Sequence, residues 1–308
     1  MNDPSESGWP GGDEWRQRLE AEGFRPSRRL GQNFLVDPGR CAAIAALAEP
    51  LTGAFVLEIG VGLGFLTRHL LERGACVVGV EVDRRLAELA LVDLERTAQS
   101  AGTTYRLIVA DALEAKSRLA RPLLDALPAS GAWQVVSNLP YSIASPVIAL
   151  LGRVPNPPSA MTVLIQREVA DRLAATPGSA DWGALSVRVQ AAYRARIALR
   201  VPPGAFRPRP KVDSAVVRLE RRPDAPNAEL ATRLDGLVGA AFGQRRKRLR
   251  NTLAPFLGGP EHAEALCRSH GVDPAARPQE LPLAAFLELA RVWPLAAAPP
   301  LIPEPYES

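Results

Sequence analysis

The stretch F-V-L-E-I-G-V-G-L-G, residues 55–64, constrains the fold more than any other part of this chain. Its first five residues form an apolar run broken by one acid, which predicts a buried strand. Glycines follow at Gly60, Gly62 and Gly64, and residues 65–72 have helical spacing. A strand, a glycine-rich turn and a helix in this order open the βα unit of a nucleotide-binding parallel sheet. The sequence therefore predicts an α/β fold, and 308 residues leave room for a second domain.

Polar side chains follow the next three predicted strands, at the point where each strand ends. Glu81 follows the apolar run 76–80 and lies 21 positions beyond Gly60, where the ribose-binding acid falls in such folds. Asp111 and Asn138 follow the third and fourth strands in the same way. Because open sheets bind their ligands at the carboxyl ends of the strands, we expect these side chains to form one row with the glycine turn.

The glycine spacing distinguishes two kinds of cofactor. The dinucleotide fingerprint is G-x-G-x-x-G, whereas this chain has G-x-G-x-G with Phe65 at the sixth position. A pyrophosphate needs a free helix N-terminus, but S-adenosylmethionine has no phosphate. We therefore expect S-adenosylmethionine, with its methionine part against Gly60 and Gly62. Glu81 would hold the ribose hydroxyls, and Asp111 would accept a hydrogen bond from the adenine amino group. An NAD-linked oxidoreductase is the alternative that this spacing disfavours.

The segment S-N-L-P-Y, residues 137–141, joins the fourth predicted strand to a predicted helix. Pro140 disfavours the helical conformation for Leu139 and removes one backbone donor, so the Leu139 carbonyl can project outward. Together with the Asn138 side-chain oxygen it would form a pair of acceptors beside the flat Tyr141 ring. Two acceptors and a stacking surface suit a planar ring with an exocyclic amino group, such as adenine. The alternative is an Asx-type turn that closes the strand.

Composition argues against several other classes of protein. The three cysteines and three histidines form no cluster, so we expect neither a disulfide framework nor a metal site. No apolar run approaches the roughly 20 residues needed to span a bilayer, and the polar N-terminus has no secretory h-region. We therefore expect a cytoplasmic enzyme.

Basic residues gather in three clusters, although the net charge is only +4. The clusters lie at residues 25–29, at residues 194–211 and in R-R-K-R-L-R at residues 245–250. They predict binding of a polyanion, the alternative being an ordinary solvated surface. In the second cluster a Pro-rich loop holds Phe206 beside Arg207, Arg209 and Lys211. An exposed aromatic there suits stacking on an RNA base, although it could instead anchor the loop onto the core.

The order of these patterns predicts two domains between two disordered ends. Residues 1–20 predict a disordered leader and the Pro-rich residues 294–308 a disordered tail. Residues 21–222 form the predicted catalytic domain, and residues 228–293 a small helical domain. Strands are predicted at 55–59, 76–80, 105–110, 133–136, 161–165, 183–193, 196–201 and 211–219. Helices are predicted at 38–48 (with Asp37 as N-cap), 65–72, 143–151, 166–175, 230–242, 245–257, 261–270 and 282–292.

These segments together resemble the small-subunit (16S) rRNA adenine-N6 dimethyltransferases, relatives of the erythromycin-resistance rRNA methylases. The matching segments are G-Q-N-F-L (31–35), E-I-G-V-G-L-G (58–64), V-E-V-D (80–83), D-A (111–112), N-L-P-Y (138–141), Q-R-E-V-A-D-R-L (166–173), F-R-P-R-P-K-V-D-S-A-V-V-R-L (206–219) and F-G-Q-R-R-K-R-L-R-N-T-L (242–253). Two positions depart from the family pattern: Val61 replaces a common Pro, and Ser137 a common Gly. The resemblance implies a Rossmann-like class I S-adenosylmethionine-dependent methyltransferase sheet with a small C-terminal all-helical domain.

The resemblance also implies roles for particular residues. Those expected to contact S-adenosylmethionine are Asn33, Leu35, Gly60, Gly62, Glu81, Asp111 and Asn138. Those expected to receive the target adenine are Asn138, Leu139 and Tyr141, with Phe206 stacking from the other side. Those expected to contact RNA are Arg207, Arg209, Lys211, Arg245, Arg246, Lys247, Arg248 and Arg250, the last five on a helix. No metal is expected.

The implied function is dimethylation of N6 on two adjacent adenines in a hairpin loop near the 3′ end of 16S rRNA. The substrate would be an immature small ribosomal subunit in the cytoplasm, and the enzyme a monomer. Two alternatives stay open beside the oxidoreductase. One is a resistance-type methyltransferase acting on 23S rRNA, and the other is a non-catalytic ribosome-assembly factor.

Overall fold

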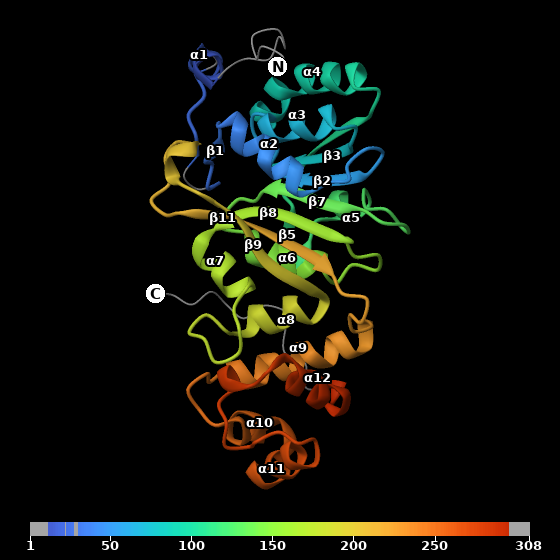
Figure 1. Ribbon diagram of the computed structural model, residues 1–308, viewed down its shortest axis with the longest axis vertical. Helices are drawn as coiled ribbons and strands as arrows, with labels where there is room; N and C mark the ends of the chain where they lie inside the picture. The colour runs from blue at the N-terminus through green and yellow to red at the C-terminus, as the bar shows by residue number, and fades with distance from the viewer. Residues whose placement is uncertain (1–11, 22, 28–29, 296–308) are drawn as a thin grey trace.

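The computed structural model describes residues 12–21, 23–27 and 30–295, and its centre is a seven-stranded sheet (Figure 1). The first five strands in the sheet are parallel, and the last two are each antiparallel to the strand before them. The predicted α/β fold is therefore confirmed. In sheet order the strands are β4 (Tyr105–Val109), β3 (Cys76–Glu81), β2 (Phe55–Ile59), β7 (Gln134–Asn138), β8 (Ala160–Gln166), β11 (Ser214–Arg221) and β9 (Tyr193–Val201).

The strand order reverses at β2. The chain adds β3 and β4 on one side of this strand and then places β7 on the other. The β2–β7 ladder holds two residue pairs, Val56 with Gln134 and Leu57 with Val135, so the two strands part before their carboxyl ends. In open α/β sheets a ligand binds in the crevice outside the strand ends where the order reverses. The topology alone therefore points to the ends of β2 and β7.

Helices cover both faces of the parallel part of the sheet. On one face α2 (Pro38–Leu47), α3 (Phe65–Glu72) and α4 (Arg84–Ser100) contribute buried leucine, isoleucine and alanine side chains. On the other face lie α5 (Arg121–Leu124), α6 (Ala144–Leu151) and α7 (Arg167–Leu173). The predicted cap of α2 is confirmed, because the Asp37 carboxylate accepts a hydrogen bond from the Arg40 amide at 3.0 Å.

Two small ladders lie outside the main sheet. The strands β5 (Leu113–Ala115) and β6 (Arg118–Leu119) form a hairpin. More important for the site, β1 (Phe34–Leu35) pairs with β10 (Phe206–Arg207), which follows a short 3₁₀ helix, η2 (Pro203–Ala205). This pairing joins the segment ahead of α2 to the basic loop that precedes β11.

Residues 183–193 were predicted to be a strand, and that prediction is wrong. They form the helix α8 (Ala184–Ala192). Val189 packs against the core of the sheet, whereas Val187 and Ala191 pack into the core of the C-terminal helices. A helix buried on two sides has apolar residues around its whole circumference, so its sequence loses the helical period.

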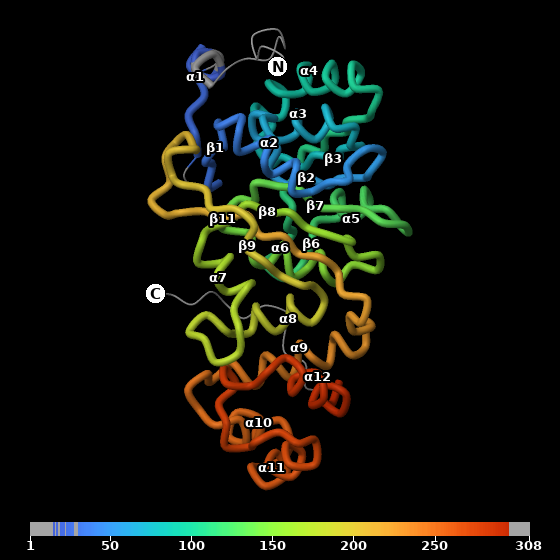
Figure 2. The backbone as a smooth tube through the Cα atoms, viewed as in Figure 1, coloured from blue at the N-terminus to red at the C-terminus, as the bar shows by residue number. Residues whose placement is uncertain are grey.

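The C-terminal part is helical and forms the end of the molecule opposite α4 (Figure 2). Its elements are α9 (Ala228–Phe242), α10 (Leu249–Leu257), α11 (Pro260–Ser269), a 3₁₀ helix η3 (Pro278–Glu280) and α12 (Leu283–Val292). Phe242 stacks on Phe286 at a ring-centroid distance of 5.6 Å. The same core contains Trp182, whose indole N–H donates to the Leu281 carbonyl at 3.1 Å. The helical domain thus takes part of its core from residues ahead of the predicted boundary at residue 222.

Part of the predicted disordered leader is a helix, α1 (Gly12–Ala21). Its Trp15 is only 1% exposed and meets the Phe65 ring edge-on, at a centroid distance of 6.0 Å. One large aromatic side chain buries enough apolar area to order a short polar segment. The prediction of disorder is therefore wrong for residues 12–20. Residues 1–11, and residues 296–308 of the predicted tail, lie outside the described residues.

A buried carboxylate joins the two domains. Asp235 on α9 is 4% exposed and accepts from Arg153 Nη2 at 2.7 Å and from Arg188 Nε at 3.2 Å. Arg153 follows α6, and Arg188 lies on α8. One acid between two guanidinium groups thus adds a buried polar link between the helical domain and the sheet domain, beside the packing of α8.

Replacing Asp235 by alanine is expected to lower the free energy of unfolding by about 3 kcal/mol, because it leaves buried guanidinium charge without its partner. Urea unfolding followed by circular dichroism measures the change. The control is Asp224→Ala, which removes an exposed ion pair with Arg222 and should cost about 0.5 kcal/mol. Equal losses in the two variants would contradict the role given to Asp235.

Candidate active site

A cavity of about 660 Å³, open to solvent, lies at the carboxyl ends of β2, β3, β4 and β7. The strand ends supply Gly60, Glu81, Asp111 and Asn138, which the sequence predicted to form one row; the structure brings these four residues together. The full lining is Leu30, Gly31, Gln32, Asn33, Phe34, Ile59, Gly60, Gly62, Val80, Glu81, Val82, Leu86, Ala110, Asp111, Ala112, Asn138, Leu139, Pro140, Tyr141 and Ile143.

The glycines of the turn after β2 are required by close packing as well as by conformation. Gly60 has φ +81°, and a Cβ atom there would lie 3.2 Å from Cδ of Pro140. Gly62 has φ +57°, and a Cβ atom there would lie 3.2 Å from the ring of Phe34. A side chain at either position would be strained and would push against a wall of the cavity. The turn thus presents bare backbone to a ligand.

Glu81 is held by backbone amides at the end of β3. Its Oε2 accepts from the Gly62 amide at 2.8 Å, and its Oε1 accepts from the Asp83 amide at 2.9 Å. The residue is 5% exposed, and burial raises the pKa of its carboxyl, an effect that these two amides oppose. Each carboxylate oxygen can accept a second hydrogen bond, so the group can still receive two neighbouring hydroxyls.

Asp111 and the N-terminal segment complete the cofactor side of the cavity. Asp111 is exposed, and its Oδ1 accepts from the Leu113 amide at 2.9 Å. Gln32 donates to Asp83 Oδ2 at 3.0 Å, which ties the segment before β1 to the end of β3. The sequence did not identify Gln32 as a wall residue, because the loop around it carries no local pattern; its only signal was membership of G-Q-N-F-L.

Asn138 and Leu139, the predicted pair of acceptors, both line the cavity. The Asn138 amide nitrogen Nδ2 donates to the Asn33 carbonyl at 3.3 Å, which fixes the amide so that Oδ1 is left as an acceptor. The Leu139 amide donates to the Leu164 carbonyl at 3.1 Å, while no described residue donates to the Leu139 carbonyl itself. Pro140 follows and has no amide hydrogen. Both oxygens therefore keep free acceptor capacity beside the cavity.

Ser137 explains one departure from the family pattern. Its hydroxyl donates to the Ile59 carbonyl at 2.6 Å, just where the β2–β7 ladder has ended. The side chain is completely buried. A serine here satisfies a carbonyl that the diverging strands leave unpaired, so the substitution supports the site rather than disturbing it.

Tyr141 lines the cavity beside these acceptors and is half-buried. Its hydroxyl lies 2.6 Å from the hydroxyl of Ser214. Burial raises the pKa of Tyr141, so the group stays a neutral phenol over the physiological range. The stacking of this ring on a base stays a prediction.

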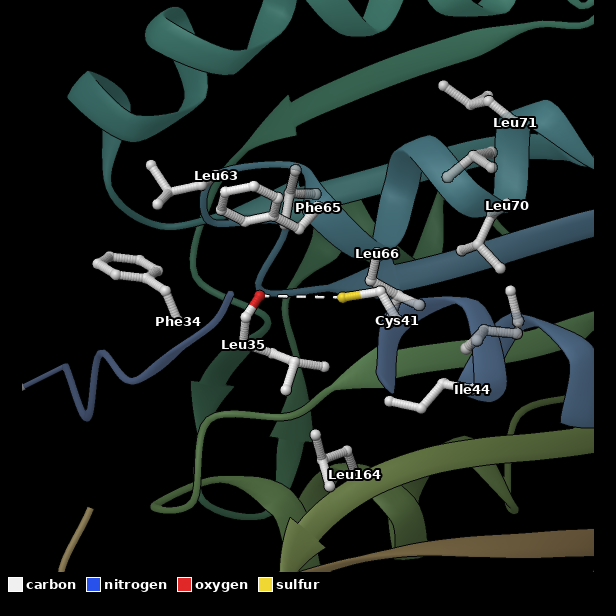
Figure 3. Close-up of a cluster of buried hydrophobic side chains, with 14 of the residues drawn as sticks. Phe34, Leu35, Cys41, Ile44, Leu63, Phe65, Leu66, Leu70, Leu71 and Leu164 are labelled. Atoms are coloured by element: carbon white, nitrogen blue, oxygen red, sulfur yellow. Dashed lines mark hydrogen bonds between the residues drawn. The ribbon is translucent and has the colours of Figure 1, made fainter. Parts of the chain in front are cut away.

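Two predicted contacts differ from the structure. Phe206 is fully buried in the core and does not line the cavity, so the prediction of an exposed aromatic that stacks on a base is wrong for this arrangement. The reason is its pairing with Leu35 in the β1–β10 ladder, which turns the ring inward. The Leu35 side chain is buried among Cys41, Ile44 and Leu164, and its carbonyl accepts from the Cys41 thiol at 3.9 Å (Figure 3). Leu35 therefore supports the cavity wall from behind.

The basic residues are exposed except Arg250, which is half-buried, and they do not form one helix. Arg245–Arg248 form a turn, and α10 begins at Leu249, so the prediction of a helix over residues 245–250 is wrong except at its end. Arg245 donates to the Ala180 carbonyl and to Gln279, and Arg250 pairs with Glu264 at 2.8 Å. Among the residues predicted to contact RNA, six are exposed and form no ion pair with a described residue: Arg207, Arg209, Lys211, Arg246, Lys247 and Arg248.

The shape of the cavity fits S-adenosylmethionine better than a dinucleotide. The lining includes Gly60 and Gly62 but neither Gly64 nor Phe65 at the start of α3. Phe65, the first residue of α3, instead packs against Trp15. Bare glycine backbone and the two carboxylates Glu81 and Asp111 suit the groups that S-adenosylmethionine presents.

Two further properties were checked over the part of the chain that the structure describes. It holds no cluster of three or more metal-binding side chains. Nor is any helix within it long and apolar enough to cross a membrane.

Comparison with known proteins identifies the family. The ribosomal RNA adenine dimethylase family matches residues 23–293. Ribosomal RNA small subunit methyltransferase A of Phenylobacterium zucineum is 42% identical over 290 residues, which cover 92% of this chain and 96% of the relative. The protein of the same name from Anaeromyxobacter dehalogenans (strain 2CP-C) is 43% identical and covers 90% of this chain and 96% of its own.

Solved structures agree with this result. The 23S rRNA methyltransferase ErmE is 26% identical, with a TM-score of 0.62, covering 85% of this chain and 99% of its own. A dimethyladenosine transferase from Plasmodium falciparum, 22% identical with a TM-score of 0.64, shares the fold over 82% of this chain and 94% of its own. The class of fold and the methyl donor expected from the sequence are confirmed. The chain belongs to the ribosomal RNA adenine dimethylase family and is a methyltransferase that uses S-adenosylmethionine.

Proposed function

We propose that this enzyme dimethylates N6 of two adjacent adenines in a hairpin loop near the 3′ end of 16S rRNA. The names of its relatives support the small subunit as the target. The observation that carries the chemistry is the Asn138 amide, whose nitrogen donates to the Asn33 carbonyl and whose oxygen is left as an acceptor at the cavity. This oxygen and the carbonyl of the next residue, Leu139, can serve the two hydrogens of an adenine amino group.

The acceptor pair performs the step that adenine itself resists. The lone pair on N6 is delocalised into the ring, so the amino group is a poor nucleophile. Asn138 Oδ1 and the Leu139 carbonyl would each accept one amino hydrogen, which orients N6 and favours its pyramidal form. S-adenosylmethionine supplies an activated methyl group on a positively charged sulfur. Positioning then carries most of the rate, and the proton leaves after transfer, when the product amine is acidic.

The cofactor would be held by the other strand ends. Gly60 and Gly62 leave room for the methionine part against the turn. Glu81, aligned by two amides, would receive the ribose hydroxyls, and Asp111 the adenine amino group. Asn33 lies between this side and the acceptor pair, since its carbonyl holds Asn138. We assign it to the boundary between cofactor and substrate.

The target adenine would leave its stack to enter the cavity, at a cost of a few kcal/mol that stacking on Tyr141 partly offsets. The surrounding RNA would be held by the unpaired cations of residues 207–211 and 246–248. Contacts of this kind position the phosphate backbone and do not read sequence. We further propose that the monomeric enzyme acts in the cytoplasm on an immature small subunit.

Neutralising Arg246, Lys247 and Arg248 together by glutamine is expected to reduce RNA affinity at least tenfold. The slope of log affinity against log salt concentration should fall by about three, one for each lost phosphate contact. Filter binding over a salt series measures both. Arg84→Gln on α4, exposed and paired only loosely with Glu88, is the matched control and should leave both values unchanged. An unchanged slope in the triple variant would remove these residues from the RNA surface.

The test of the function is mass spectrometry of rRNA fragments. Purified protein is incubated with labelled S-adenosylmethionine and with small or large subunits from cells that lack this enzyme. Two adjacent dimethyladenines in the small-subunit rRNA are expected. Label in the large-subunit rRNA alone would favour the resistance-type reaction, and no label in either would favour an assembly factor without catalysis.

A further inference from the structure

The phenol of Tyr141 is anchored by a residue that lies far away in the sequence. Tyr141 Oη and Ser214 Oγ are 2.6 Å apart and 73 positions apart in the chain. Tyr141 belongs to the turn after β7 and lines the cavity, whereas Ser214 begins β11. The bond thus connects the wall of the cavity to β11, which lies on the other side of β8 from β7.

Ser214 is a rigid point of attachment. It is 1% exposed, and β11 lies between β8 and β9, so Ser214 has a strand neighbour on each side, Gln166 and Val201. Its hydroxyl has no described hydrogen-bond partner other than Tyr141. The Ser214 hydroxyl is buried on a strand that is paired on both sides, so its position is fixed. The hydrogen bond therefore holds the hydroxyl end of the Tyr141 side chain in place.

We infer that Ser214 is a positioning residue for methyl transfer, which sets the orientation of the Tyr141 ring against which the target adenine packs. The inference rests on the proposed function, because it gives Tyr141 the task of holding that base. A tyrosine side chain turns about two torsions. The hydrogen bond at its tip holds Oη in place and so fixes χ1, and it favours one χ2 because a phenolic oxygen makes its hydrogen bonds close to the ring plane. Without the bond the ring still offers stacking area, but no longer at one fixed angle to the acceptor pair.

The second methyl transfer depends on this angle more than the first. N6-methyladenine has one amino hydrogen left, so only one of the two acceptors, Asn138 Oδ1 or the Leu139 carbonyl, can still be satisfied. The stacking face then carries a larger share of the orientation. A loosened ring should therefore lower the second step more than the first, and monomethylated product should accumulate.

The experiment compares Ser214→Ala, Tyr141→Phe and the double variant. Both single changes remove the same hydrogen bond, one from the strand and one from the ring, and Tyr141→Phe keeps the stacking face. We expect each variant, and the double, to lower kcat by roughly tenfold, because a small loss of alignment has effects of this size. Affinity for S-adenosylmethionine and for RNA should stay within about twofold of the parent enzyme, and the ratio of monomethyl to dimethyl product should rise. Ser214→Thr, which keeps the hydroxyl and suits a strand, should restore most of the rate.

Several results would overturn the inference and leave the proposed function standing. One is that the parent enzyme is active and that Ser214→Ala has the same kcat and the same ratio of monomethyl to dimethyl product. Another is a double variant whose kcat falls by the product of the two single reductions, because two residues that act through one bond should together lower kcat no more than either does alone. A third is a kcat for Tyr141→Phe far below that for Ser214→Ala, because the phenol would then act directly in methyl transfer and not through Ser214. If the parent enzyme itself transfers no methyl group, the proposed function fails instead. Should Ser214→Ala not fold, Tyr141→Phe tests the same bond at the exposed end.

Discussion

Replacing Asn138 by alanine is expected to lower the rate of methyl transfer about a thousandfold and to leave RNA binding within a few-fold of the parent. The change removes Oδ1, one of the two acceptors that orient N6, and it also removes the bond to the Asn33 carbonyl. Losing one preorganised polar contact at a reacting group has effects of 10²–10³ in other enzymes. Single-turnover methyl transfer with saturating cofactor measures the step directly, and calorimetry measures cofactor affinity separately.

The matched control is Asn33→Ala. It deletes the neighbouring side chain but keeps the backbone carbonyl that holds Asn138, so the chemical step should fall far less. A thousandfold loss in both variants would mean that the cavity wall has collapsed and that no special role belongs to Asn138. A parent-like rate in Asn138→Ala would remove the acceptor pair from the mechanism.

The second large effect concerns stability and its dependence on pH. Glu58 on β2 is 1% exposed, and its Oε2 has no hydrogen-bond partner among the described residues. Burial raises the pKa of its carboxyl to about 8; the nearby Thr67 hydroxyl lowers it, and the charge of Glu81 raises it further. The folded protein therefore keeps a proton at neutral pH that the unfolded chain, with a pKa near 4.5, has released.

The sign follows from which state binds the proton more tightly. Between pH 4.5 and about 8 the folded state holds more protons, so its stability falls as pH rises through this range and levels off above it. The pKa difference corresponds to roughly 5 kcal/mol at most. Glu58→Gln has no proton to lose, so at pH 9 its free energy of unfolding should exceed that of the parent by several kcal/mol. At pH 5 the two proteins should be close.

Urea unfolding at pH 5, 7 and 9 tests this prediction. Glu88→Gln, an exposed acid on α4, provides the control and should keep the slope of the parent. If Glu58→Gln keeps that slope as well, the carboxyl is ionised in the folded protein and some group beyond those described must hold its charge.

The strand ends could be predicted because their signals are local. Each motif follows its strand directly in the sequence: glycine after the first apolar strand, an acid after the next, and Asn-Leu-Pro-Tyr after the fourth. Parallel strands end at the same edge of the sheet, which brings these motifs together. The amide orientation of Asn138 could not be predicted, because it depends on the Asn33 carbonyl from another part of the chain. Gln32 and Ser214 entered the site in the same way, through contacts between distant segments.

The errors also have physical causes. Residues 245–248 have good helix formers, but the amides of Leu249 and Arg250 donate to the carbonyls of Ala276 and Pro274, which fixes a turn ahead of α10. The ring of Phe206 turns inward because β10 pairs with β1. Tertiary contacts decided these cases against local preference.

The position of α8 limits which segments related proteins can exchange by recombination. Its two sides complete two different cores, and Trp182 just ahead of it is bonded to Leu281 near the far end of the chain. A chimera joined at residues 223–227 would pair α8 of one relative with the helical domain of another, so neither core would keep its own packing. We therefore expect exchange between relatives to be tolerated only when α8, the sheet domain and the helical domain come from the same parent.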